Sequence, residues 1–140
     1  MASRAEEFMR RPTTIEIRIR TKECERREEQ EKLTPQGIDY QRDRIDSSRK
    51  NMLEEITAEL SAIDEEIDEL WRDYRQAKMD VIRTAYQIGR QEESAVLVMY
   101  YIGKAKVHTI AQVLHYSEQN IYKLRREGLE HLDEILQKRK

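Results

Sequence analysis

A run of heptads through the middle of the chain limits its fold more than any other feature. Between residues 53 and 88, apolar side chains recur at alternating spacings of three and four residues. This pattern predicts one long helix with a narrow apolar seam that winds around a partner helix. One seam row holds Leu53, Leu60, Ile67, Tyr74, Val81 and Ile88, and the other holds Ile56, Ile63, Leu70, Ala77 and Thr84.

The length of this helix requires a partner. A helix over residues 46–88 is roughly 65 Å long, whereas a globule of this chain length is only about 30–40 Å across. The helix must therefore pair with the N-terminal helix as a hairpin, with another copy of the chain, or with both. We expect self-association as a dimer or a higher even-numbered assembly. The predicted oligomerisation residues are Leu53, Ile56, Leu60, Ile63, Ile67, Leu70, Tyr74 and Val81.

Composition supports an all-α fold. Charged residues make up 39% of the chain and aromatic residues 6%, with only four glycines and two prolines. Long, solvated helices have this composition, whereas β-sandwiches and Gly-rich nucleotide-binding folds do not. The lone cysteine, Cys24, excludes an intrachain disulfide and a cysteine-based zinc site, and it fits a reducing cytosolic setting.

Several functional classes find no support in the sequence. No apolar run approaches the roughly 20 residues of a membrane span, and the N-terminus lacks the apolar core of a signal peptide. Phosphate-loop, nucleophile-elbow and metalloprotease signatures are missing. The acidic run at residues 64–69 is expected to be a solvated helix face, and His108, His115 and His131 are expected to be ordinary surface residues. We therefore predict no enzyme, no cofactor, no metal and no membrane partner.

The N-terminal third is expected to contribute one helix. Residues 1–12 are polar and are predicted to be frayed. Residues 13–33 are rich in Lys, Glu and Arg, which favour a helix, although their Ile-x-Ile-x-Ile stretch is a strand pattern. We predict a helix and keep a short strand as the alternative. The Thr-Pro-Gln-Gly stretch at residues 34–37 predicts a break.

Three shorter helical patterns follow Gly89, which is expected to close the long helix. Residues 92–102 are strongly apolar and must be buried, and residues 107–114 carry apolar side chains at helical spacing. After a tight turn, Ser117 is a good N-cap for a final helix. The apolar face of that helix consists of Ile121, Leu124, Gly128, Leu132, Ile135 and Leu136.

The last two patterns form a helix-turn-helix motif, in which a tight turn joins two short helices and the second bears exposed polar residues. Ala111 is small enough to let the helices approach closely. Ile121 and Leu124 are expected to lock the second helix onto the first, and Tyr116 is expected to plug the turn. We therefore divide the chain into a charged N-terminal helix and loop (1–44), an oligomerisation helix (45–89) and a helix-turn-helix domain (90–140).

A helical wheel identifies the outward face of the final helix. With Ile121 at the core, Gln119, Lys123, Arg126 and Glu130 lie within about 40° of the opposite side. Gln, Lys and Arg can hydrogen-bond base edges, and the cations can neutralise phosphates. The start of the preceding helix faces the DNA backbone in helix-turn-helix proteins. The candidate DNA-binding residues are Glu118, Gln119, Tyr122, Lys123 and Arg126 on the final helix, and Lys104, Lys106 and His108 near the start of the preceding one.

Residues 101–132 resemble the helix-turn-helix of sigma-70 region 4. The matching residues are Ile110, Ala111, Leu114, Tyr116, Ser117, Ile121, Tyr122, Leu124, Arg126, Glu127 and Leu129. A charged N-terminal helix and a long central helix before such a domain resemble the phage late-transcription activators of the RinA and ArpU type. The resemblance implies that Glu118, Gln119 and Tyr122 read the major groove. It also implies that Lys123 and Arg126 contact phosphates or bases.

The sequence departs from this family pattern at two places. His115 takes the turn position where Gly is common, so it must adopt a left-handed or bridge conformation, which His tolerates better than most residues. Lys106 stands where a Thr often caps the first helix, so the start of that helix is less well defined.

The expected function is that of a phage-encoded, sequence-specific DNA-binding regulator of late transcription, acting as an oligomer in the cytoplasm of the host bacterium. Its expected partners are double-stranded DNA, further copies of itself and, from the sigma likeness, host RNA polymerase. Two alternatives stay open. One is a DNA-packaging adaptor like the small terminase subunits, and the other is an interaction module that binds RNA polymerase rather than DNA.

Overall fold

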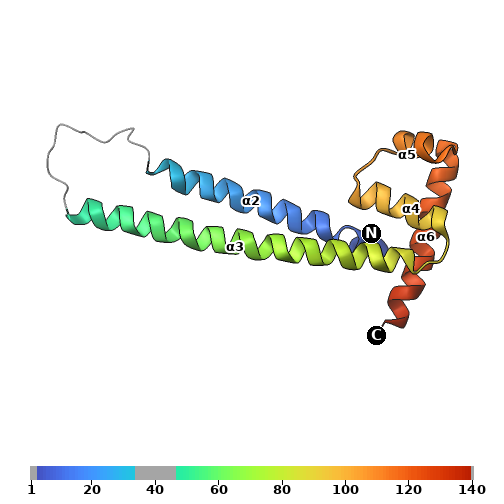
Figure 1. Ribbon diagram of the computed structural model, residues 1–140, viewed down its shortest axis with the longest axis horizontal. Coiled ribbons are helices and arrows are strands. Elements are labelled where there is room, and N and C mark those ends of the chain that lie inside the picture. Colours follow the sequence, from blue (N-terminus) through green and yellow to red (C-terminus); the bar gives the residue numbers. More distant parts are fainter. Residues whose placement is uncertain (1–2, 34–46, 140) are drawn as a thin grey trace. The chain divides into compact units, whose positions relative to one another are not determined.

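The computed structural model describes residues 3–33 and 47–139, and every regular element in that part of the chain is a helix (Figure 1). The all-α prediction is therefore confirmed. None of the described helices is long and apolar enough to cross a bilayer. In chain order the elements are α1 (Arg4–Met9), α2 (Arg11–Glu31), α3 (Ser47–Tyr86), α4 (Gln91–Leu97), the π-helical turn η1 (Val98–Ile102), α5 (Val107–Leu114) and α6 (Glu118–Lys138).

Contacts among the described residues group into two units. The hairpin unit lies between Glu16 and Arg72 and contains most of α2 and the first part of α3. The head unit contains the described residues up to Ile15 and from Asp73 onward, including α1, α4, η1, α5 and α6. The divisions predicted after residues 44 and 89 follow expected helix ends rather than these contacts, and they stay predictions.

In the hairpin unit α2 and α3 run antiparallel (Figure 1). Two ion pairs connect the helices and show their register: Arg26 Nε lies 2.5 Å from Asp64 Oδ1, and Lys22 Nζ lies 2.6 Å from Glu66 Oε2. The long helix therefore pairs with the N-terminal helix as a hairpin. The helix predicted for residues 13–33 is confirmed and the strand alternative is wrong. The predicted break at residues 34–37 lies outside the described residues.

The apolar seam of α3 is unevenly covered within the hairpin unit. Ile56 and Ile63 are 6% and 4% exposed. The other seam residues of this unit are half-buried: Leu53, Leu60, Ile67 and Leu70. Few apolar side chains of α2 pack against this seam: Ile19 is its one fully buried large side chain, and Ile17 is 63% exposed. One row of the seam therefore stays partly open along the hairpin.

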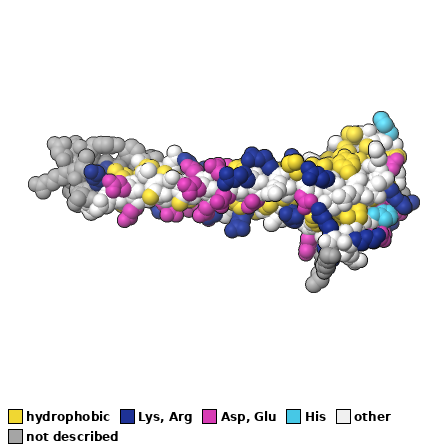
Figure 2. Space-filling model, turned by 60° about the horizontal axis from the view of Figure 1, so that its bottom comes forward, with side chains coloured by type: hydrophobic (Ala, Val, Ile, Leu, Met, Phe, Trp, Pro, Cys, Tyr) yellow, Lys and Arg dark blue, Asp and Glu magenta, His cyan; other side chains and the backbone are white. Residues whose placement is uncertain are grey.

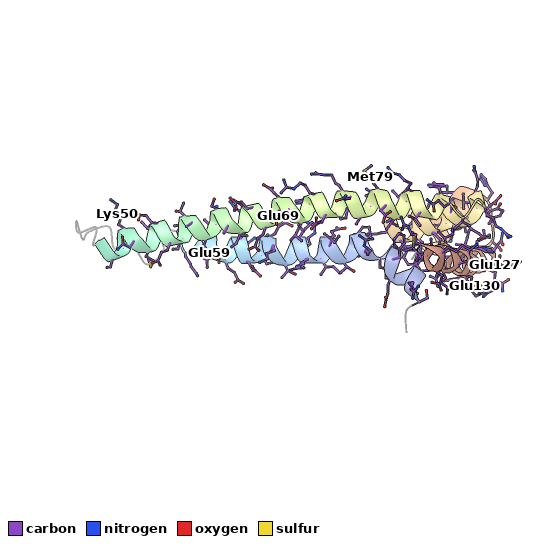
Figure 3. The ribbon with its side chains drawn as sticks, turned by 90° about the horizontal axis from the view of Figure 1, so that it is seen from below. Lys50, Glu59, Glu69, Met79, Glu127 and Glu130 are labelled. Carbon is purple, nitrogen blue, oxygen red and sulfur yellow. The ribbon has the colours of Figure 1, made fainter. Side chains whose placement is uncertain are left out.

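The polar faces of the hairpin helices are solvated. Figure 2 shows acidic and basic side chains interspersed along α2 and α3, and Glu59 and Glu69 are labelled on α3 in Figure 3. In the acidic run, Asp64 and Glu66 form the ion pairs with α2, and Glu65, Asp68 and Glu69 are exposed. No group of three His, Cys, Asp or Glu side chains in the described part of the chain could hold a metal ion.

The head unit joins the two ends of the chain. Its main core combines Ala5, Phe8 and Met9 of α1 with buried residues of α3, α4, η1 and α6. The Ala5 N–H donates to Asp133 Oδ1 of α6 at 3.0 Å, and the Ser3 hydroxyl caps α1 by accepting from the Glu6 N–H. The prediction that residues 1–12 are frayed is therefore wrong for residues 3–12, the part of this segment that the structure describes, because apolar packing against α6 holds α1 in place.

Residues 92–102 are helical and largely buried, as predicted. Leu97 is fully buried and Tyr101 is 4% exposed, and this burial raises the pKa of the Tyr101 hydroxyl. The hydroxyl of Ser94 donates to the Ala85 carbonyl at 2.8 Å and so ties α4 to the end of α3. Gly89 lies between these helices with a φ of +79°, a conformation that suits glycine.

The α4 helix crosses α6 at Gly128. A Cβ at that position would lie 3.2 Å from Leu97 Cδ1, so the glycine permits the close approach. Beside the crossing, His131 Nδ1 lies 2.5 Å from Oε1 of Glu93, a carboxylate whose residue is only 2% exposed. His131 was expected to be an ordinary surface residue. It is half-buried instead, because Glu93 requires a partner in the interior.

Candidate nucleic-acid interface

The turn between α5 and α6 adopts the geometry that the sequence predicted. His115 lies in the left-handed region, with φ 60° and ψ 44°. Its N–H and that of Tyr116 both donate to the Ala111 carbonyl, which makes a Schellman-type helix end. The hydroxyl of Ser117 then caps α6 by accepting from the Asn120 N–H at 3.1 Å. The predicted turn and cap are confirmed.

A second apolar core holds the two helices of the motif together. It consists of Val96, Ile110, Ala111 and Ile121, with Leu124 packed against it. The packing predicted for Ala111, Ile121 and Leu124 is confirmed. The prediction for Tyr116 is wrong: this side chain is 38% exposed. Backbone hydrogen bonds close the turn, so no apolar plug is needed there.

The predicted outward face of α6 is exposed to solvent. Gln119, Lys123, Arg126 and Glu130 are exposed, and Tyr122 is 51% exposed. Figure 3 labels Glu130 on this helix. Within residues 3–33 and 47–139, the side chains of Gln119, Lys123 and Arg126 have no hydrogen-bond or ion-pair partner. An exposed amide and two exposed cations on one helix face can reach base edges or phosphates.

A groove of about 550 Å³ beside α6 brings together most of the other predicted residues. Lys104 and Lys106 line it from the loop before α5, His108 lines it from the first turn of α5, and Glu118 and Tyr122 line it from α6. His108 Nδ1 lies 3.4 Å from Glu118 Oε1, so the first turns of the two helices meet here. Lys106 is the N-cap residue of α5 and makes no side-chain capping bond. The sequence predicted a less well defined start for this helix, because a Thr cap is missing there.

The loop after η1 presents the two lysines at this groove. The Gly103 N–H donates to the Val98 carbonyl, and the Ala105 N–H donates to the Met99 carbonyl. A Cβ at Gly103 would lie 2.8 Å from the Met99 oxygen, so a larger residue would force the loop apart. Lys104 follows with a φ of 55°, which turns the chain toward α5.

Other groove residues were not found by sequence reasoning. Arg10 and Thr13, at the junction of α1 and α2, line the groove together with Tyr100 of η1. Nε and Nη2 of Arg10 donate to Glu6 Oε1 at 3.2 and 3.0 Å, and this carboxylate raises the pKa of the guanidinium. No sequence pattern places residue 10 beside residue 100, because that proximity depends on the packing of α1 in the head unit.

Arg125 is another residue that the sequence did not reveal. Its guanidinium carbon lies 4.7 Å from the centre of the Tyr100 ring and 5.7 Å from that of Tyr122, within cation–π range. A wheel places Arg125 about 40° from Ile121, so an outward-face criterion passes over it. Arg125, Tyr122 and Arg126 also border a hollow of about 400 Å³.

Comparisons with known proteins assign the chain to a family. No curated protein and no solved structure matches it. Residues 35–133 match the model of a family described as "Protein of unknown function (DUF1492)". The match contains all of α3, α4, η1 and α5 and most of α6, and thus the whole turn of the helix-turn-helix. The protein is therefore a member of the DUF1492 family.

Proposed function

We propose that the protein is a sequence-specific DNA-binding regulator of transcription, of the phage late-gene kind, and that it reads DNA with α6. The observation that carries the proposal is the exposed row of Gln119, Lys123 and Arg126 on a helix that begins at a capped turn. A helix of this kind fits the major groove, which is about 12 Å wide. The resemblance to sigma-70 region 4 supports the same use of Glu118 and Tyr122.

The proposal includes binding as an oligomer. Residues 104–140 contain eight basic and five acidic residues, a net charge of +3. Phosphate neutralisation supplies much of the affinity of DNA-binding proteins, so a single copy of this weakly basic segment binds DNA weakly. Two tethered heads gain from effective concentration. The partly open seam row of α3, with Leu60 and Ile67, is the proposed surface of self-association.

The same proposal covers partners and location. A non-enzymatic regulator of phage late genes acts on DNA in the cytoplasm of a bacterial host. RNA polymerase is a second proposed partner, because the resemblance is to a module that belongs to the transcription machinery.

Footprinting with the full chain tests this function. The DNA fragments are tiled across the genome that encodes the protein, at moderate salt, and we expect protection upstream of an operon. The variant Lys123→Ala/Arg126→Ala should lose the footprint, because each contact contributes about 1–3 kcal/mol. A matched control, Arg75→Ala/Arg83→Ala, removes two exposed cations from α3 and should keep it.

Three results would overturn the proposal. Binding without sequence preference would exclude a sequence-specific regulator. A ring-sized mass in solution would favour the packaging adaptor, and capture of RNA polymerase without DNA binding would favour the interaction module.

A further inference from the structure

The lining of the groove beside α6 contains three basic side chains, Lys104, Lys106 and Arg10, from two distant parts of the sequence. Lys104 and Lys106 lie in the loop before α5, His108 lies in the first turn of α5, and Arg10 comes from the N-terminal segment. Glu118 is the one acidic residue of the lining, and it already lies 3.4 Å from His108. The groove therefore suits an anionic ligand. Arg10 and Thr13 lie outside residues 35–133, the part of the chain that matches the family.

The tyrosines of the groove indicate which part of a nucleic acid it can hold. Unpaired bases bind by stacking on exposed aromatic faces. Tyr101 is only 4% exposed and has the Arg10 guanidinium 5.1 Å from its ring centre. The Tyr100 ring has Arg125 over it at 4.7 Å. Tyr122 is 51% exposed, and Arg125 lies 5.7 Å from the centre of its ring. Each tyrosine of the groove thus already has a cation over one face of its ring, so the groove favours phosphates over stacked bases.

Arg10 is able to contact a phosphate. Its bonds to Glu6 use Nε and Nη2, which leaves Nη1 without a bond to this carboxylate. The Arg10 side chain is 49% exposed. Exposed ion pairs of this kind are weak, so a phosphate can compete with Glu6 for the guanidinium.

The groove is continuous with the face of α6 that the proposed function uses. Glu118 and Tyr122 belong to both surfaces. In helix-turn-helix complexes the start of the first helix lies against the DNA backbone. We infer that the groove holds the phosphate backbone of the duplex that α6 reads, and that Arg10 and Thr13 extend the DNA interface to the N-terminal segment. This inference rests on the proposed function.

The salt dependence of DNA binding tests the role of Arg10. The probe is a fluorescein-labelled duplex of arbitrary sequence, about 30 base pairs long or roughly three helical turns, titrated with the full chain. Loss of one phosphate contact lowers the slope of log K against log salt by about 0.9. The affinity of the unmodified protein falls when NaCl rises from about 50 to 200 mM. For Arg10→Gln this fall should be about three- to fourfold smaller. The control Arg83→Gln removes an exposed cation outside the groove and should keep the full slope.

A second pair of variants avoids any loss of the Arg10 packing. Thr13→Glu places a carboxylate on the groove wall and should weaken binding about tenfold at low salt, because it repels the phosphates. Thr14 is its exposed neighbour and does not line the groove, so Thr14→Glu should bind nearly as well as the unmodified protein. Conversely, Glu6→Gln removes the carboxylate that accepts from Arg10, so this variant should bind the duplex more tightly.

The outcomes separate this inference from the proposed function. An unchanged slope in Arg10→Gln, or equal weakening by Thr13→Glu and Thr14→Glu, overturns the inference. If the unmodified chain still gives a footprint that Lys123→Ala/Arg126→Ala loses in that case, the proposed function stands. If the unmodified chain binds no duplex even at low salt, the proposed function fails and the inference fails with it.

Discussion

His115 holds the turn of the helix-turn-helix in a backbone conformation that is costly for histidine. Its φ of 60° places Cβ close to the following carbonyl, a clash that glycine avoids. The side chain is exposed, so little packing offsets this cost. The conformation could be predicted from the sequence because the motif assigns each turn position a backbone geometry whatever residue occupies it.

Substitutions at His115 should therefore change stability through the backbone. We expect His115→Gly to raise the free energy of unfolding by about 0.5–1 kcal/mol, because relief of the left-handed strain exceeds the added entropy of the unfolded chain. His115→Val should lower it by about 1–2 kcal/mol, because β-branched residues tolerate this region poorly. Urea unfolding measures both values. Equal stability of the Val and Gly variants would contradict this account.

The site residues differ in how far the sequence can predict them. Lys123 and Arg126 follow from helical periodicity, which separates the outer face of α6 from the side that Ile121 buries. Arg10 and Tyr100 meet at the groove only through tertiary packing, so no local pattern reveals them. A helical wheel of α6 also gives no information about half-buried positions such as Arg125. The long side chain of that residue extends past its own helix to reach the Tyr100 ring.

At the scale of elements, α1 depends on the head unit for its stability. A helix of six residues does not persist alone in water, so its burial must supply the stability. Ala5, Phe8 and Met9 are at helical spacing and form one buried face. This short pattern is the signal that sequence reasoning missed, because charged residues surround it.

Truncation of a buried α1 side chain should consequently be costly. Met9 is fully buried, and we expect Met9→Ala to lower the free energy of unfolding of the head unit by about 2–4 kcal/mol. Met79 lies in the part of α3 that belongs to the same unit and is 57% exposed. Met79→Ala should therefore change the free energy of unfolding by less than about 0.5 kcal/mol. Thermal unfolding of the two variants gives the comparison. If Met9→Ala were as mild as Met79→Ala, α1 would contribute no packing energy.

The long elements were easier to predict than the short ones. The heptads locate α3 almost to its ends, because many repeats agree on one period. The run at residues 92–102 is apolar on all sides, so its pattern gives no register and no sign of the π-helical turn η1. Periodicity thus predicts that such a segment is buried, while its helical geometry depends on the neighbours it meets.

Over the whole molecule, the charge is divided more sharply than the net value of −2 suggests. Residues 46–80 hold five basic and eleven acidic residues, whereas residues 104–140 have a net charge of +3. An acidic segment is repelled by DNA and a basic one is attracted. Under the proposed function, the long helix therefore serves association between copies and not contact with phosphates.

The half-buried seam row of α3 leads to the prediction for the assembled protein. Apolar side chains such as Leu60 and Ile67 gain stability when a second copy removes them from water, at about 25 cal/mol per Å². We expect light scattering to give about twice the chain mass of 16.9 kDa or a higher even multiple. Leu60→Glu/Ile67→Glu should yield monomers, because two charges in an apolar contact cannot be desolvated without partners.

A control with the same added charge separates the seam from the rest of the helix surface. Ala58 and Ala62 are exposed on α3, so Ala58→Glu/Ala62→Glu should keep the oligomer. Both variants should retain their helical circular dichroism, since Ile56 and Ile63 still pack in the hairpin unit. If the unmodified protein were a monomer, α2 alone would cover the apolar seam of α3. In that case a single head must supply the DNA affinity, and the shallow salt dependence of one weakly basic module would follow.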